Sequence, residues 1–148
     1  MSAQLALKVD DSTAVLIKII DEPITVWSAV HRWIEDGLKH EHALISAADV
    51  FDRILRQHMT LWAIYDYGTL VGAFVTQVES GSRGRALNVI SLGGENMEDW
   101  LAPLIESLVE YGRTNRCAYI FEMGRKGWLR VLERHGWVEG PRTMIKVI

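Results

Sequence analysis

Apolar residues recur with a helical period in two stretches of the first third of the chain, and these stretches predict two amphipathic helices. The first helix carries one apolar stripe, which comprises Val26, Trp27, Val30, Ile34 and Leu38. The second is predicted from Ser46 to about His58, because Ser46 and Asp49 resemble a capping box. Ahead of both, alternation over residues 5–9 predicts a short strand, and Thr13–Ile20 is predicted as a helical segment.

The period changes from helical to alternating at Leu61, and three strands are predicted from there on. These strands are Leu61–Asp66, Leu70–Glu79 and Arg85–Leu92. Short turns that contain glycine separate them, so residues 61–92 are predicted to form an antiparallel meander.

The last third of the chain predicts two more helices and two more strands. The first of these helices has its apolar positions at Trp100, Leu101, Leu104, Ile105, Leu108 and Tyr111. Proline is tolerated in a first helical turn, so Pro103 indicates that this helix either starts near Asp99 or is kinked. The remaining elements are a strand at Tyr119–Glu122, a helix at Arg125–Arg134 that Gly136 ends, and a strand at Thr143–Ile148. Together the elements predict one α+β domain over residues 1–148.

The amino-acid composition limits the class of protein but does not indicate a particular reaction. Hydrophobic residues make up 49% of the chain and charged residues 24%, which is ordinary for a globular domain. The single cysteine, Cys117, excludes a disulfide scaffold. No apolar run approaches the ~18 residues of a membrane-spanning helix, and the first residues lack a secretion signal, so a cytoplasmic location is expected. The net charge of −3 argues against nucleic acid as a partner.

The order of the predicted elements resembles the GNAT superfamily of general N-acetyltransferases. Leu70–Val75 is similar to the family's third strand, Cys117–Phe121 to its fifth strand, and Trp128–Trp137 to the segment after it. The resemblance implies a GNAT-like α+β fold with a mixed central sheet flanked by helices, and acetyl-CoA as co-substrate. Gly124–Trp128, with the Gly136-Trp137 ending, also resembles GNAT-like proteins of tailed bacteriophages. That second resemblance would place the chain in the host cytoplasm or the virion.

The resemblance assigns acetyl-CoA to a gap between the fourth and fifth strands. Pantetheine would pair with the strand edge at residues 88–92, and the pyrophosphate would bind at the start of the next helix. The cofactor-binding residues that the resemblance implies are Ile90, Ser91, Leu92, Gly93, Gly94, Asn96, Arg125 and Lys126. Glu95, Glu98 and Asp99 stand at the same helix start, where they either compete with a phosphate for the N–H groups or only cap the helix.

A transfer reaction needs a general base near the splayed strands. Glu122, at the end of the fifth strand, is the first candidate, and Glu79, at the end of the third, is the second. The alternatives are a salt bridge from Glu122 to Arg125 or Lys126, and an exposed strand end for Glu79. The position at which the family often carries a tyrosine acid is Leu132, which cannot donate a proton.

Two functions of different classes stay open. The first is an acyl-CoA-dependent N-acetyltransferase that acts on an unknown amine, either a small molecule or a protein. The second is a catalytically silent GNAT-like binding or structural protein, which the acidic helix start and Leu132 favour. The resemblance also implies a homodimer. No metal site is expected, because His40 and His42 have no partners at zinc spacing.

Overall fold

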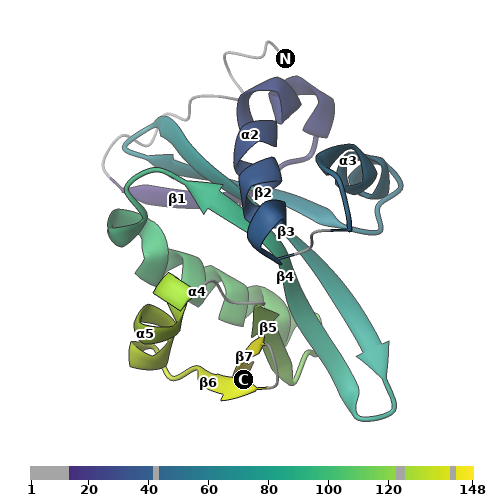
Figure 1. The fold of residues 1–148 in the computed structure, drawn as a ribbon, viewed down its shortest axis with the longest axis vertical. Helices are drawn as coiled ribbons and strands as arrows, with labels where there is room; N and C mark the ends of the chain where they lie inside the picture. Colours follow the sequence, from purple (N-terminus) through teal and green to yellow (C-terminus); the bar gives the residue numbers. More distant parts are fainter. Residues whose placement is uncertain (1–13, 42–43, 123–125, 141–142) are drawn as a thin grey trace.

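The computed structural model describes residues 14–41, 44–122, 126–140 and 143–148. Within these residues, seven strands form one sheet in the order β1-β2-β3-β4-β5-β7-β6 (Figure 1). The strands are β1 (Val15–Ile19), β2 (Thr60–Asp66), β3 (Thr69–Gly81), β4 (Gly84–Gly94), β5 (Tyr119–Glu122), β6 (Val138–Gly140) and β7 (Thr143–Val147). The helices are α2 (Pro23–Glu41), α3 (Ala47–Leu55), α4 (Met97–Thr114) and α5 (Lys126–Arg134). Only β4 and β5 pair in parallel, so the predicted α+β class with a mixed sheet is confirmed.

Residues 15–19 form a strand, which corrects the helical prediction for Thr13–Ile20. β1 pairs with β2 in antiparallel orientation along its whole length. Alternate residues pack against the apolar core, and these are Val15, Ile17 and Ile19. The period of two and the β-branched residues favour a strand over one short helical turn. The strand predicted over residues 5–9 lies outside the described residues.

The two predicted amphipathic helices are confirmed as α2 and α3, although α3 ends at Leu55 rather than near His58. The capping box is also confirmed. The Asp49 N–H donates to Ser46 Oγ at 3.1 Å, and the Ser46 N–H donates to Asp49 Oδ2 at 3.0 Å. Hydrogen bonds from the Ser46 backbone and then its hydroxyl hold the pKa of Asp49 below its ordinary value of 3.8. The reciprocal bonds satisfy N–H groups that a helix start otherwise leaves unpaired.

The predicted meander is confirmed in β2, β3 and β4. β3 and β4 are both longer than predicted, because their pairing continues to Gly81 opposite Gly84. Figure 1 shows this hairpin projecting beyond the helices. Residues 80–85, at its tip, are all exposed.

α4 connects β4 to β5 as a helical crossover, which parallel strands require. It begins at Met97, two residues before the predicted start near Asp99, so Pro103 lies beyond the first turn. Its buried face consists of Trp100, Leu101, Leu104, Ile105, Leu108 and Gly112.

The end of α5 is set by Gly136, as predicted. This glycine has a positive φ of 86°, which favours glycine. Its N–H donates to Glu133 O at 3.1 Å, and the Trp137 N–H donates to Leu132 O at 3.1 Å. These two bonds make a Schellman motif. The short strand β6, which follows, is missing from the sequence-based prediction.

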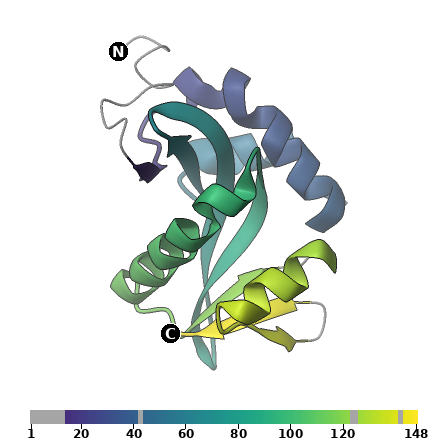
Figure 2. The same cartoon turned by 90° about the vertical axis from the view of Figure 1, so that its left-hand side faces the viewer.

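Two apolar clusters cover the two faces of the sheet. One joins α4 to residues such as Leu87 and Ile120, and the other joins α2 and α3 to residues such as Val75 and Ile90. Figure 2 shows α4 on one side of the sheet and α2 on the other. Among the described residues, the second cluster contains none from β5, β6 or β7. That part of the α2 face is therefore uncovered by α2 and α3.

Candidate active site

β5 is paired with β4 along its whole length but covers only part of β4. Their pairing begins with Ala86 opposite Tyr119 and ends with Val89 opposite Glu122. β4 continues to Gly94 with β3 as its partner. Residues 90–94 of β4 therefore extend beyond the last residue pair with β5.

A β-bulge in β4 lies directly at this point. The pairing with β3 steps from Val89 to Ser91, which leaves Ile90 as an extra residue in β4. Ile90 packs in the α2 cluster, and Ser91 Oγ donates a hydrogen bond to Ile34 O in α2 at 2.8 Å. Two consecutive side chains thus face the same helix, which a regular pleat does not allow. The bulge redirects the backbone of β4 where its pairing with β5 stops.

The contact between α2 and β4 depends on glycine. A Cβ on Gly93 would lie 2.5 Å from the carbonyl oxygen of Trp33, and one on Gly37 would lie 2.9 Å from the backbone nitrogen of Leu92. A Cβ on Gly94 would lie 2.7 Å from backbone atoms of β3. Gly93 and Gly94 therefore belong to the end of β4, where neighbouring backbone leaves no room for a side chain.

The start of α4 follows this strand end directly. Asn96 is its N-cap in left-handed conformation (φ 54°, ψ 45°), and its side chain makes no capping hydrogen bond. Glu95 turns to α2 and forms an exposed ion pair with Arg32 at 3.9 Å. Glu98 and Asp99 are exposed in the first turn, where carboxylates stabilise the helix dipole. The start of α4 thus has no side-chain cap from Asn96 and carries two nearby acids, and the Asp99 N–H donates to the backbone carbonyl of Asn96 at 3.0 Å.

The two candidate bases lie on opposite faces of the sheet. Glu122 is 2% exposed, and it is paired with Val89, whose side chain belongs to the α4 cluster. Glu79 is exposed, and its carboxylate accepts a hydrogen bond from Asn88 Nδ2 at 3.3 Å. Glu79 is paired with Ala86, which is about 10 Å from Val89 at ~3.3 Å per residue. Only Glu122 therefore lies at the end of the β4–β5 pairing.

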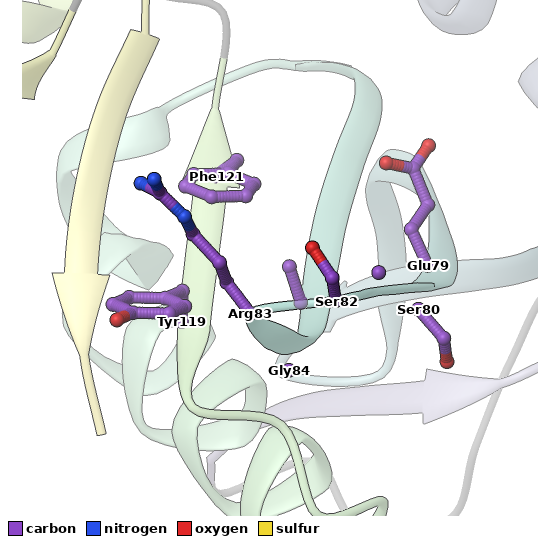
Figure 3. A pocket seen from close by; sticks show the side chains of 9 residues that line it. Glu79, Ser80, Ser82, Arg83, Gly84, Tyr119 and Phe121 are labelled. Carbon is purple, nitrogen blue, oxygen red and sulfur yellow. The ribbon is translucent and has the colours of Figure 1, made fainter.

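A cavity of about 500 Å³ lies between the hairpin tip and β5 (Figure 3). Its lining residues are Glu79, Ser80, Gly81, Ser82, Arg83, Gly84, Ala86, Tyr119 and Phe121. The rings of Tyr119 and Phe121 are nearly parallel, at an interplanar angle of 7° and a centroid distance of 6.0 Å. They form a stacked aromatic pair on the part of the α2 face that α2 and α3 leave uncovered.

The structure describes six of the eight predicted cofactor-binding residues in full. Ile90, Ser91, Leu92, Gly93, Gly94 and Asn96 are consecutive or nearly so in β4 and the start of α4. Arg125 lies outside the described residues, as does the side chain of Lys126, so their assignment stays a prediction.

The sequence-based prediction did not include the stacked pair of Tyr119 and Phe121 or Arg83 among the residues of the site. Tyr119 and Phe121 had a usable signal, because residues two apart in a strand point to the same face. The bulge at Ile90 had none, since nothing in the run of apolar residues marks an extra position.

Neither a metal-ligand group nor a membrane-spanning helix is present among the residues that the structure describes. No group of three or more His, Cys, Asp or Glu side chains is arranged to hold a metal ion there. No helix in that part of the chain is long and apolar enough to cross a membrane.

Comparison with solved structures identifies the architecture. A GNAT-family acetyltransferase from Streptococcus pneumoniae superposes with a TM-score of 0.63 at 15% identity, over 90% of this chain and 99% of that one. A ribosomal-protein-alanine N-acetyltransferase from Brucella melitensis gives 0.65 at 13% identity, over 90% and 99%. The chain has the GNAT fold. A predicted acetyltransferase from Clostridium acetobutylicum, solved with acetyl-CoA, gives 0.62 at 11% identity, over 85% and 91%.

The sequence itself carries little of this likeness. No family model matches the chain, and no curated protein matches it. In GNAT terms, the unpaired end of β4, at residues 90–94, is where the family resemblance placed the acetyl donor, and α4 is the helix expected to face its pyrophosphate. The fold match covers 85–90% of this chain and 91–99% of the solved chains. It therefore includes the elements around the end of β4.

Proposed function

We propose that this chain is an acyl-CoA-dependent N-acetyltransferase, which moves an acetyl group from acetyl-CoA to an amine. The observation that supports this most is the coincidence of three features at one place. The β4–β5 pairing ends at Val89, the bulge at Ile90 redirects β4, and α4 starts a few residues later. An extended strand edge followed by a helix N-terminus suits a ligand with amide groups and a diphosphate.

Proton transfers divide the reaction into two parts. The incoming ammonium first gives one proton to a base, and its lone pair then attacks the thioester carbonyl carbon. A C–N bond forms, the C–S bond breaks, and the second nitrogen proton ends on the CoA thiolate. The products are an N-acetyl amide and free CoA thiol, with one proton released. Orientation of amine and thioester supplies much of the rate in such a transfer.

Glu122 is the proposed base, because it belongs to the last residue pair between β4 and β5, next to the stretch of β4 that β5 does not cover. Glu79 is the second candidate, and its distance from that point suits a route through water better than direct abstraction. Leu132, at the usual tyrosine position, is 3% exposed in the α4 cluster. The thiolate proton therefore has to come from the amine itself or from water.

Neutralising the two acids at the start of α4 is expected to strengthen CoA binding. The double variant Glu98→Gln, Asp99→Asn removes two negative charges next to the proposed diphosphate site. Helix-terminus charges of this kind are worth roughly 0.3–1 kcal/mol each, so CoA should bind roughly 3- to 30-fold more tightly to the double variant. Calorimetric titration with CoA, repeated at raised salt, measures the change.

The matched control places the same charge change further along the helix. Glu106→Gln, Glu110→Gln alters two exposed residues of α4 that are remote from its start, so CoA affinity should stay unchanged. S-acetylpantetheine, which lacks the diphosphate, should bind all three proteins equally. If no protein gives heat with millimolar acetyl-CoA, the silent alternative replaces the transferase.

Glu122→Gln is expected to lower the transfer rate by roughly 100-fold or more, since general-base catalysis is worth about 10²–10⁴-fold. The assay follows free CoA thiol with a primary-amine panel that includes a peptide starting with alanine, the residue named for the Brucella enzyme. Acetyl-CoA affinity should stay the same in the variant, and Glu106→Gln is the rate control. An unchanged rate in Glu122→Gln with a large drop in Glu79→Gln would assign the base to Glu79.

A further inference from the structure

An exposed basic surface lies where α4 ends and the chain turns into β5. Arg113 is in the last turn of α4, and Arg116 lies in the turn that follows. Arg85 in β4 adjoins this turn, because its carbonyl oxygen accepts a hydrogen bond from the Ala118 N–H at 2.9 Å. All three arginines are exposed. Arg85, Arg113 and Arg116 together form the basic end of the molecule.

The three residues of the basic end lie on one face of the sheet. Leu87, two residues along β4 from Arg85, packs in the α4 cluster. Residues two apart in a strand point to the same face, so Arg85 is on the face that α4 covers. Figure 2 shows the last turn of α4 and the hairpin of β3 and β4 at the same end of the molecule. The basic end therefore presents its positive charges at one place on the surface.

These charges are not neutralised within the part of the chain that the structure describes. None of the ion pairs found there involves an arginine of the basic end. The nearest acid along α4 is Glu110, one turn before Arg113, and it takes part in none of those pairs either. Like charges held together repel one another, so a surface of this kind favours an anionic partner.

Arg116 has a backbone conformation that favours glycine. Its φ is 60°, and it directly follows the C-cap residue Asn115, at the position where glycine usually ends a helix. The Cys117 N–H donates to Gly112 O at 2.8 Å and closes the turn. A side chain in this conformation costs stability. The helix dipole accounts for a cation at Arg113, but it does not account for an arginine in place of glycine at the next turn.

The charges around the basic end favour a short acidic peptide segment over a nucleic acid. A nucleic acid would extend along α4 onto surface that carries acids, since Glu106 and Glu110 are both exposed, and the chain as a whole has a net charge of −3. A guanidinium binds a carboxylate through two parallel hydrogen bonds. Alternate side chains of an extended peptide lie about 7 Å apart on one side, so several carboxylates can face neighbouring arginines at once.

We propose that the basic end binds an acidic segment of a partner protein, in which carboxylates alternate along an extended chain. Its carboxylates pair with Arg85, Arg113 and Arg116. This contact explains why an arginine occupies a position that favours glycine. The inference goes beyond the proposed transfer, because the basic end and the start of α4 are separated by an 18-residue helix, which is about 27 Å long.

A peptide in which three glutamates alternate with threonine tests the proposal. In an NMR titration at low salt, it should shift the backbone amides of residues 85 and 113–118, and raised salt should weaken its binding. The same peptide with glutamine in place of glutamate should not bind. Arg85→Met, Arg113→Met and Arg116→Met should each lower the affinity for the glutamate peptide about 2- to 5-fold, as the loss of an exposed charge pair does.

Arg56→Met is the charge-matched control for these three variants. Arg56 is also an exposed arginine at the end of a helix, but it is already paired with Asp52 at 3.1 Å. Its replacement should therefore leave the affinity for the glutamate peptide unchanged.

Arg116→Gly separates binding from stability. Glycine relieves the positive φ, so the melting temperature should rise by about 2–4 °C, while the affinity for the glutamate peptide falls about 2- to 5-fold. Gln57→Gly is the control, because Gln57 has a φ of 63° and follows the C-cap residue of α3. It should raise the melting temperature by a similar amount and leave the affinity unchanged.

A thymidylate tetramer, which carries as many negative charges as the glutamate peptide, distinguishes the partner classes. Binding of the peptide that depends on the three arginines and exceeds that of the tetramer supports the proposal. Tighter binding of the tetramer would assign the basic end to a nucleic acid and overturn the acidic segment. The proposal also fails if millimolar peptide shifts no amide of the basic end, or if Arg56→Met weakens binding as much as Arg116→Met does. A lower melting temperature in Arg116→Gly together with a higher one in Gln57→Gly would overturn the explanation given for Arg116.

Discussion

Replacing Trp100 with alanine is expected to lower the free energy of unfolding by about 3–5 kcal/mol, the usual cost of deleting a buried tryptophan side chain. The indole is fully buried in the α4 cluster, and its N–H donates to Glu95 O at 2.7 Å. The variant therefore loses apolar packing together with the bond that ties α4 to the end of β4. Urea unfolding measures the stability, and calorimetric titration should show that the folded variant binds acetyl-CoA more weakly.

Trp100→Phe is the informative control for this prediction. Phenylalanine keeps most of the apolar contact but cannot donate to Glu95 O, so a cost of about 1–2 kcal/mol is expected. A loss below about 1 kcal/mol in the alanine variant would contradict the packing described for this side chain.

Gly93→Ala is expected to cost about 1–3 kcal/mol, in the range of other overpacked sites. The added methyl would lie 2.5 Å from Trp33 O and 3.1 Å from Trp33 Cα. These are backbone atoms of a helix, which cannot rotate away as a side chain can. Either α2 or β4 has to move, and that movement displaces the strand edge proposed to hold pantetheine. Urea unfolding and acetyl-CoA titration should therefore both report a loss.

Gly81→Ala makes the same chemical change where there is space. No atom lies within 4 Å of a Cβ at that position, so a change within about 0.5 kcal/mol is expected. Equal effects of Gly81→Ala and Gly93→Ala would mean that α2 does not approach β4 as closely as described.

Much of the fold was predictable because the apolar pattern is regular where the chain packs on the sheet. The meander shows this, since alternation from Leu61 onwards predicted three strands and the structure lengthened each of them by one to three residues. Residues 15–19 show the limit. Five residues hold little more than one helical turn, so period alone did not separate a strand from a helix, and the pairing with β2 decided it.

The candidate site was less predictable, because it depends on contacts between distant segments. Glu122 and the β4 edge could be proposed from their places at strand ends, and their roles stay proposals. The bulge at Ile90 and the contact between Gly93 and Trp33 exist only once α2 lies on β4. Gly93 and Gly94, which the sequence resemblance named as cofactor-binding residues, are the last two residues of β4, and the backbone contacts that require glycine there could not be predicted.

The hairpin tip has a consequence for how this protein can change during evolution. Ser80–Arg85 belong to neither apolar cluster, and exposed turns accept substitution and insertion more readily than packed strands. Five of the residues that line the cavity, Ser80, Gly81, Ser82, Arg83 and Gly84, come from this turn. The wall of this cavity can therefore change in sequence with little loss of stability, whereas the end of β4 is fixed by the packing of α2 and α4 around it.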